Sequence, residues 1–362
     1  MAEVRFGLIG VNGIGRTHRR ALENIEGAKI AAVCDIVEEW AKEAGEQYEC
    51  PWFVDYHDLV ARDDIDIVSV LTPHYLHAPM AIAAAENGKN VFVEKPLCIS
   101  VSEADAMIEA AQKNNVKLGV CQQQRSSRQF RLLKKMIDAG EIGTLWRVVM
   151  ISCGVRTQAY YGTGEWRGTW SLEGGGVLIN QHVHDVDTLQ YLVGKPTLVA
   201  GNIQTLTHDI AVEDLATAFI HFENGVDGLF QTSNIDGATF NGIQVAGNKG
   251  ILVSGQGLRI GRPEMPSDEF VRENPEKFGK METTWEDLEP EEGPSGHPAM
   301  IQDMIDAVVN DGQPEVHGEE ARTAIELLNA MILSAKRQKM VPVPVDRAEY
   351  DELLAELRAD EQ

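Results

Sequence analysis

The chain has 362 residues, of which 43% are hydrophobic and 24% are charged, which is an ordinary globular composition with room for two domains. This composition excludes a collagen, a disulfide scaffold, a coiled coil and a disordered chain. The formal net charge of −24, from 32 Lys plus Arg against 56 Asp plus Glu, disfavours nucleic acid and anionic membranes as partners.

Three further features indicate a soluble, cytoplasmic protein. The densest basic stretch, residues 125–135, mixes its charges with apolar residues as an amphipathic helix does. The five cysteines show no C-x-x-C spacing, which indicates a reducing compartment and no metal site. The N-terminus opens into the apolar run Val4–Ile9 without the parts of a signal peptide, and no uncharged stretch approaches the roughly 20 residues of a membrane helix.

Short β-branched runs alternate with helical patterns in the first third of the chain, which predicts a parallel sheet wrapped by helices. Several runs are almost entirely apolar, which is typical of strands covered on both faces. The fold class is therefore α/β, with a doubly wound, Rossmann-type domain over residues 1–123. The expected strands are Val4–Gly10, Lys29–Cys34, Trp52–Val54, Ile65–Leu71, Asn90–Glu94 and Lys117–Cys121, and the helices between them include Ala78–Asn87 and Val101–Asn114.

Residues 124–362 are expected to form a substrate-binding and oligomerisation domain of the α+β class, with a large, mainly antiparallel open sheet. A helix is expected at Phe130–Ala139, a strand at Trp146–Cys153, and a second helix directly after the triple glycine at 174–176. Residues 263–296, rich in Pro and Glu, predict an ordered surface loop. Further strands are expected at Thr197–Thr205, Thr217–Phe222, Val226–Thr232, Phe240–Val245 and Gly250–Val253, and closing helices at 297–311, 319–337 and 347–358.

A glycine-rich turn joins the first strand to the first helix, where backbone N–H groups and the helix dipole can hold a pyrophosphate. The predicted cofactor contacts in this turn are Gly10, Asn12, Gly13, Ile14 and Gly15. Asn12 replaces the second glycine of the usual G-x-G-x-x-G pattern, and Asn tolerates left-handed backbone geometry.

An acidic residue lies at the end of the second strand, 20 residues beyond Gly15. This residue, Asp35, can accept hydrogen bonds from the ribose hydroxyls and repel a 2′-phosphate. We therefore expect NAD as the cofactor, in preference to NADP. A plain strand–helix turn, with Asp35 as a turn residue, is the alternative.

Two motifs follow the fourth and fifth expected strands, Thr72-Pro73-His74-Tyr75-Leu76-His77 and Glu94-Lys95-Pro96. Together with the glycine-rich turn they resemble the Gfo/Idh/MocA oxidoreductase family, which includes glucose–fructose oxidoreductase and inositol dehydrogenase. The resemblance continues through Trp166-Arg167, the triple glycine, His184 and residues 247–250 and 341–344, so it spans essentially the whole chain.

The resemblance implies an NAD(P)-binding Rossmann domain and a sugar, polyol or sugar derivative bound between the two domains. It also implies a homodimer or homotetramer, because an open sheet leaves one face to cover. Further cofactor contacts are expected where the chain leaves the fourth, fifth and sixth strands, at Thr72, Pro73, His77, Glu94, Lys95, Pro96 and Gln123.

Lys95 and His184 are the expected catalytic pair. A lysine in a cleft is partly desolvated, which lowers its pKa and lets it give or take a proton. The family has its catalytic His at the position of His184 and usually an Asp four residues earlier, where this chain has Asn180. Because an Asn takes up no proton, we expect Lys95 and His184 to share the proton transfer while Asn180 binds a substrate hydroxyl. Some sugar-processing members resemble this chain in having Asn-Gln there.

The substrate side is expected to combine one helix face with an aromatic loop. On a helix after the triple glycine, Asn180, His184, Asp187 and Tyr191 would share one arc. An aromatic-rich loop at 160–170 can stack on sugar C–H faces, although ordinary packing under a long loop is the alternative. The expected substrate contacts are Asn180, Arg125, Tyr160, Trp166, Arg167 and Asp187, whereas His182 is expected to be packed.

The predicted reaction is hydride transfer between C4 of the nicotinamide and a secondary alcohol carbon of the substrate, with Lys95 and His184 as acid and base. Two alternatives remain open. A glycosidase or epimerase could use tightly bound NAD without net redox change, and a non-catalytic sugar sensor could use the same fold. The presence of both Lys95 and His184 argues against the sensor.

Overall fold

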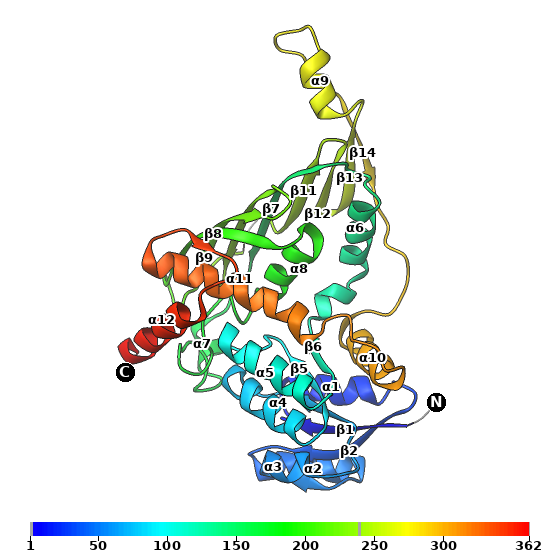
Figure 1. Ribbon diagram of the computed structural model, residues 1–362, viewed down its shortest axis with the longest axis vertical. Helices are drawn as coiled ribbons and strands as arrows, with labels where there is room; N and C mark the ends of the chain where they lie inside the picture. Colours follow the sequence, from blue (N-terminus) through cyan, green and yellow to red (C-terminus); the bar gives the residue numbers. More distant parts are fainter. Residues whose placement is uncertain (1–2, 238–239, 362) are drawn as a thin grey trace.

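The computed structural model describes residues 3–237 and 240–361, which form two sheets with helices packed against them (Figure 1). The first sheet has the order β3-β2-β1-β4-β5-β6, and every neighbouring pair is parallel. The predicted doubly wound domain is therefore confirmed. Its strands are β1 (Val4–Ile9), β2 (Ala28–Cys34), β3 (Trp52–Phe53), β4 (Ile67–Val70), β5 (Asn90–Glu94) and β6 (Leu118–Cys121).

The strand order reverses beside β1, which lies between β2 and β4. In doubly wound sheets a crevice opens at this switch point, outside the carboxyl ends of the strands. All residues of β4 are buried, as expected for a strand covered on both faces. The covering helices are α1 (Ile14–Leu22), α2 (Glu38–Tyr48), α3 (Tyr56–Val60), α4 (His77–Glu86) and α5 (Val101–Lys113).

The second sheet is mainly antiparallel, as predicted, with the order β14-β13-β12-β11-β7-β10-β9-β8-β15. One central pair departs from a simple meander, because β7 and β10 are parallel. The strands are β7 (Leu145–Cys153), β8 (Pro196–Gln204), β9 (Leu215–Phe222), β10 (Asp227–Ser233), β11 (Gly242–Gly247), β12 (Gly250–Gly255), β13 (Gly257–Pro263), β14 (Thr283–Asp287) and β15 (Val341–Pro342).

One face of this sheet is covered by α6 (Arg128–Asp138), α8 (Val183–Val193) and α11 (Gly318–Arg337) (Figure 1). The opposite face carries exposed apolar side chains. Leu229 on β10 lies in register between Phe219 on β9 and Val149 on β7, and Leu229 and Phe219 are 52% and 36% exposed. The sheet is therefore open on its outer face.

Two expectations about local structure were wrong. The helix expected directly after the triple glycine begins only at Val183, because the carboxylate of Glu213 accepts the N–H groups of Gly176 and Leu178 and holds residues 177–182 in turns. Residues 263–296 are more than a loop. They contain α9 (Ser267–Glu273), which projects beyond the sheet at the top of Figure 1, and β14, which pairs with β13 as an edge strand of the sheet.

The C-terminal third returns to the first sheet. Helix α10 (Gly296–Val309) packs against α1, and the N–H of Val120 in β6 donates to the carbonyl of Val316 at 2.9 Å. Helix α12 (Arg347–Asp360) reaches α5 through Asp351, which accepts from Ser102 at 2.6 Å. The domain boundary after residue 123 stays a prediction.

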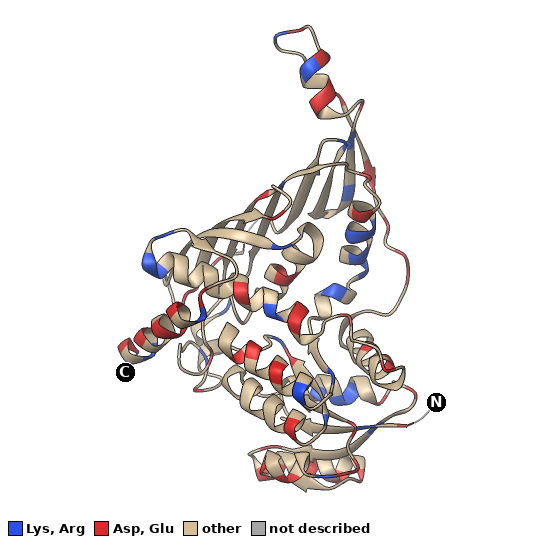
Figure 2. Cartoon of the chain, viewed as in Figure 1, with Lys and Arg blue, Asp and Glu red and all other residues tan. Residues whose placement is uncertain are grey.

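Acidic side chains are spread over most elements, whereas basic ones gather along α6 and the turn before it (Figure 2). Each basic residue of this stretch has an acidic partner, which neutralises the densest basic patch of the sequence. The pairs are Arg125 with Asp187, Arg128 with Glu292, Arg131 with Glu315, Lys134 with Asp138 and Lys135 with Glu291. Within the described residues, no helix has the length and apolar character needed to cross a bilayer.

Candidate active site

A cavity of about 480 Å³ opens at the carboxyl ends of β1, β2, β4 and β5. Its walls come from two separate segments, since residues 9–95 form one side and residues 163–180 form the other. The cavity brings together most of the site residues expected from the sequence. These are Gly10, Asn12, Gly13, Ile14, Asp35, Thr72, Pro73, Glu94, Lys95, Trp166, Arg167 and Asn180.

The glycine-rich turn has the geometry that a pyrophosphate requires. A Cβ on Gly15 would lie 2.2 Å from the carbonyl oxygen of Gly10, so only glycine lets α1 start this close to β1. The residues of the turn with positive φ are Gly10, at +89°, and Gly13, at +52°, and not Asn12. A Cβ on Gly13 would meet nothing within 4 Å, and no side chain caps α1. The helix N-terminus is thus open toward the cavity and fits a phosphate.

Asp35 lies where the cavity passes the end of β2. Its two carboxylate oxygens accept the N–H groups of Val11 and Val37, each at 3.0 Å, and this fixes the side chain beside the turn. The exposed side chains of Ile36 and Trp40 line the same end of the cavity. Among the described residues that line the cavity, Lys95 and Arg167 are the only Lys or Arg, and the hydrogen-bond partners of the Asp35 carboxylate are the backbone N–H groups of Val11 and Val37.

Lys95 lies at the other end of the cavity. Its Nζ donates to the backbone carbonyl of Asn180 at 2.8 Å, and its backbone N–H donates to Glu94 at 3.0 Å. Burial lowers the pKa of the Lys95 amine, and the charge of Glu94 opposes that shift. An amine with a lowered pKa is suited to exchanging a proton near neutral pH.

Glu94 is the centre of a buried polar cluster that the sequence did not predict. His18 Nε2 lies 2.7 Å from Glu94 Oε1, and His297 Nε2 lies 3.3 Å from the same oxygen. Burial alone would raise the pKa of Glu94, but the two imidazoles hold it well below its usual range. With Cys121, these residues offer four ligand atoms within 4.8 Å of one another, the one such group among the described residues that could hold a metal. They come from four distant segments, so no spacing in the sequence reveals them.

His184 is buried beside the sixth strand and is not among the residues that line the cavity. Its Nδ1 lies 2.9 Å from the amide oxygen of Gln122. Because an amide oxygen only accepts, Nδ1 carries the proton and Nε2 is left with a lone pair. Burial and then the charge of Lys95 keep the pKa of His184 well below its usual value, so the ring is neutral.

Asn180 lies in the turn before α8, so it does not share a helix face with His184. Its Nδ2 donates to a carboxylate oxygen of Glu173 and lies 3.3 Å from the hydroxyl of Tyr160. Glu173 was not predicted as a site residue, although it directly precedes the triple glycine. Burial raises the pKa of Glu173 to about 7.

The aromatic loop forms the wall over Lys95 and Asn180. The guanidinium of Arg167 lies 4.3 Å from the ring centroids of both Tyr160 and Trp166, and it donates to the Tyr160 hydroxyl. Trp166 in turn contacts His74, with ring centroids 4.9 Å apart. Trp166 and Arg167 line the cavity, whereas Tyr160 lies behind them.

Arg125 and Asp187 bind each other through two hydrogen bonds of 2.7 Å, and Arg125 also reaches Glu320 at 2.8 Å. Both lie away from the cavity wall, so their predicted contact with substrate stays a prediction. His182 is buried against Asp185 at 2.6 Å, as expected for a packed residue.

His77 is buried behind the cavity wall and connects two of the segments that form it. Its ring nitrogens lie 2.7 Å from the carbonyl of Pro96 and 2.8 Å from that of Thr72, so it ties the ends of β4 and β5 together. Gln123, His77 and Pro96 do not line the cavity, and their predicted contact with the cofactor stays a prediction.

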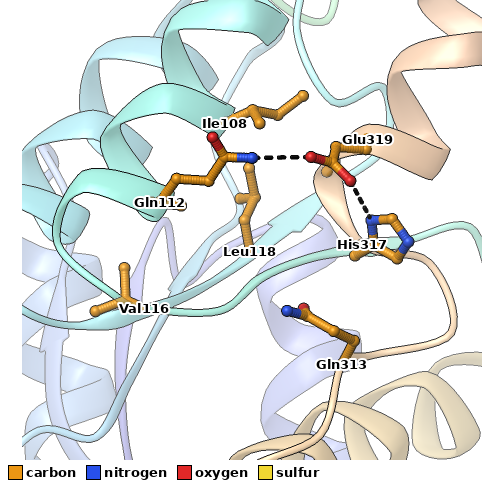
Figure 3. A pocket seen from close by; sticks show the side chains of 9 residues that line it. Ile108, Gln112, Val116, Leu118, Gln313, His317 and Glu319 are labelled. Carbon is orange, nitrogen blue, oxygen red and sulfur yellow. Dashed lines mark hydrogen bonds and ion pairs between the residues drawn. The ribbon is translucent and has the colours of Figure 1, made fainter.

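A second cavity of about 190 Å³ lies between α5, β6 and the start of α11 (Figure 3). Glu319 accepts from Gln112 at 2.8 Å and lies 3.9 Å from His317, over the apolar side chains of Ile108 and Leu118. None of the predicted site residues borders it.

Two segments of the chain match known domain families. Residues 4–122 match an oxidoreductase family with an NAD-binding Rossmann fold, GFO_IDH_MocA, and residues 130–253 match the GFO/IDH/MocA C-terminal domain.

Individual relatives match over parts of their length. The chain is 38% identical to the inositol 2-dehydrogenase of Salmonella typhimurium over 146 residues, which is 39% of this chain and 43% of that protein. It is 31% identical to the scyllo-inositol 2-dehydrogenase (NAD(+)) of Bacillus subtilis over 241 residues, 64% of this chain and 67% of that protein.

A solved structure matches over nearly the whole chain. This is the WlbA dehydrogenase from Bordetella pertussis in complex with NADH and UDP-GlcNAcA, with a TM-score of 0.81 and 28% identity over 95% of this chain and 100% of that one.

Proposed function

The chain belongs to the Gfo/Idh/MocA oxidoreductase family, and on that premise we propose that it is an NAD-dependent dehydrogenase of sugars, polyols or their derivatives. It moves a hydride between C4 of the nicotinamide and a secondary alcohol carbon. The observation that carries this proposal is the half-buried amine of Lys95, which lies in the same cavity as the open glycine-rich turn and Asp35.

The two ends of the cavity bind different parts of the cofactor. The N-terminus of α1, with Gly13 and Ile14, binds the pyrophosphate, and Asp35 binds the adenosine ribose. Thr72, Pro73 and Glu94 border the nicotinamide end next to Lys95. When bound, NAD supplies the hydride acceptor, and the protein supplies orientation and proton transfer.

Lys95 and His184 move the proton of the reacting hydroxyl. The lowered pKa of Lys95 leaves part of its population as a neutral amine, which takes the proton as the hydride leaves. The Nε2 lone pair of neutral His184 provides a second acceptor, oriented by Gln122. Asn180 binds a substrate hydroxyl, and Trp166 with Arg167 forms the wall against the sugar ring.

The cofactor is NAD in preference to NADP. A 2′-phosphate would lie against Asp35, and the nearest basic residue after it, Lys42, faces solvent near Glu46. Repulsion in a partly buried site should cost NADP about 2 kcal/mol, roughly thirtyfold in affinity. The NADH bound by the Bordetella relative supports this preference. Equal affinities for NADH and NADPH in a fluorescence titration would contradict it.

The chain assembles as a homodimer or homotetramer through the outer face of the large sheet. This proposal is supported by the exposed apolar row formed by Phe219, Leu229 and Val149, which a monomer would leave in water.

The test of the activity begins with the purified protein and its absorbance and mass spectrum. A net dehydrogenase should purify largely without cofactor. It should then reduce added NAD when a sugar or polyol from a panel is supplied, and the NADH formed is measured by its absorbance at about 340 nm. Co-purifying NAD(H) without net reduction would favour the redox-neutral alternative. Absence of any nicotinamide binding would contradict both.

A further inference from the structure

A buried carboxylate lies against the amide of Asn180 at the edge of the cavity. Glu173 is fully buried and accepts a hydrogen bond from Asn180 Nδ2, while Asn180 itself borders the cavity. The other oxygen of Glu173 accepts the N–H of Gly168 at 2.5 Å. Glu173 therefore contacts the site through Asn180 and does not reach the cavity itself.

This carboxylate is held by amides, without a paired cation. The nearest guanidinium, that of Arg167, donates to Tyr160 and to Thr163 instead. Asp187, by contrast, is equally buried but has both oxygens bound by Arg125. Burying a carboxylate without an ion pair is costly, and a core that only needed packing would not require one.

The Asn180 side chain is oriented by this contact. Asn180 Nδ2 has two N–H groups, and it donates to Glu173 and to the hydroxyl of Tyr160, the latter at 3.3 Å. The amide therefore has its Oδ1 acceptor left for the cavity. The backbone carbonyl of the same residue accepts from Lys95 Nζ at 2.8 Å. One residue thus connects the buried carboxylate to both the substrate side of the cavity and the catalytic amine.

We propose that Glu173 is the positioning residue of this site: its carboxylate fixes Asn180, and through the backbone carbonyl of Asn180 it fixes the position of the Lys95 amine. This inference rests on the proposed function for its kinetic test. Glu173 is not among the described residues that line the cavity, so its carboxylate acts through Asn180 and not on the substrate.

The charged and titratable groups around Glu173 come from several segments. Arg167 and Glu213 act on its charge, Tyr161 and the buried imidazole of His74 lie beside it, and Lys95 lies beyond Asn180. Arg167 favours the ionised form of Glu173, and Glu213 opposes it. Ionised Glu173 in turn raises the pKa of Lys95.

The kinetic test is the pH dependence of kcat in Glu173→Gln. Oxidation requires neutral Lys95, so kcat should rise with pH as Lys95 loses its proton. Removing the negative charge lowers the pKa of Lys95, so the rise of kcat should move to lower pH. Loss of orientation should also reduce the maximal kcat at high pH about ten- to a hundredfold. NADH affinity should stay within about twofold, because the turn and Asp35 are untouched.

Glu103→Gln is the matched control. Burial also raises the pKa of the Glu103 carboxyl, which accepts the backbone N–H of Ile99 at 3.0 Å and forms no hydrogen bond with the described residues 173–182. This variant should lose stability, while the rise of kcat with pH should stay where it is in the wild type. The double variant Glu173→Gln with Asn180→Asp returns one carboxylate next to Lys95, so it should move the rise of kcat back toward the wild-type position. If Glu173→Gln resembles Glu103→Gln in both measurements, the carboxyl only packs and the proposal is overturned.

A second readout does not require activity. An infrared titration of the buried carboxyl carbonyl band should lose one of its components in Glu173→Gln. Because coupling is reciprocal, Lys95→Ala should shift the midpoint of that component upward. An unshifted midpoint would overturn the proposal even if no substrate were known, whereas a shifted midpoint in a protein that binds no nicotinamide would leave the coupling intact and refute the proposed function alone.

Discussion

The Lys95 side chain is half-buried, its Nζ donates to the carbonyl of Asn180 and its backbone N–H donates to Glu94. This environment decides its chemistry. Lys95→Ala should lower kcat by about 10²–10⁴-fold, the usual contribution of positioned proton transfer. The affinity for NADH should change little, because the glycine-rich turn and Asp35 remain. Steady-state kinetics and a fluorescence titration check the two parts. A Lys95→Ala protein with near-normal kcat would contradict the proposed mechanism.

Lys95 and His184 should behave as one unit. If they share the proton transfer, the double variant Lys95→Ala with His184→Ala should lose less activity than the two single losses multiplied together. Gln122→Ala, which removes the partner of His184 Nδ1, serves as a milder control for the orientation of the ring. Strict multiplicativity of the two losses would show that the residues act independently.

The buried acids Glu173 and Glu213 should make stability depend on pH. Burial raises the pKa of each to about 7, well above the unfolded value, so the folded state holds extra protons below pH 7. Their contribution to stability is therefore present at low pH and is lost as pH rises through 7. Ionisation of each carboxyl should lower the free energy of unfolding by about 1 kcal/mol between pH 6 and pH 8.

Chemical denaturation of wild type and Glu213→Gln at pH 6 and pH 8 measures this difference. The variant should lose less stability over that interval than the wild type. An equal loss in the two proteins would mean that Glu213 does not titrate in the folded protein between pH 6 and pH 8.

Single residues were predictable from the sequence where a local motif fixes their neighbours. The turn at Gly10–Gly15, Asp35 at the end of β2 and Lys95 at the end of β5 all follow strands that the sequence marks clearly. Glu173 could not be predicted, because its importance depends on contacts with Asn180 and Gly168. His18 and His297 meet at Glu94 from segments almost 280 residues apart, which no spacing indicates.

Among the elements, the segment with the triple glycine has no room for a side chain at Gly176. A Cβ on Gly176 would lie 1.9 Å from the carbonyl oxygen of Glu213, so Gly176→Ala must displace the backbone that carries Asn180. We expect a loss of about 3 kcal/mol or more in the free energy of unfolding, together with most of the activity. Gly154→Ala is the control, because a Cβ there meets nothing within 4 Å. Equal thermal stability of the two variants would contradict this reading of the turn.

At this scale the sequence predicted the parallel sheet better than the second one. Fully buried strands such as β4 and β5 are continuous apolar runs, whereas the parallel pairing of β7 with β10 leaves no local pattern. β14 was missed because all its residues are exposed and its sequence is rich in polar residues. The start of α8 was misplaced because a distant side chain, that of Glu213, takes the N–H groups that a helix would use.

For the whole molecule, the outer face of the large sheet predicts assembly. Leu229→Lys should place a charge in the apolar row next to Phe219 and shift the protein toward a monomer of 39.9 kDa. Val309→Lys, at a 46% exposed position on α10, is the control and should leave the assembly unchanged. Light scattering at micromolar concentration measures both. A wild type that is already monomeric would refute the assembly.

The return of the chain to β6 has a consequence for synthesis on the ribosome. The carbonyl that accepts from Val120 belongs to Val316, about 195 residues after β6 ends. At roughly 5–20 residues per second, the nascent N-terminal half waits about 10–40 seconds with that edge strand unpaired. An open, apolar edge is a template for pairing with another chain. We therefore expect residues 1–123, produced alone, to aggregate unless residues 296–340 are supplied in trans, and the full chain to depend on chaperones during that interval.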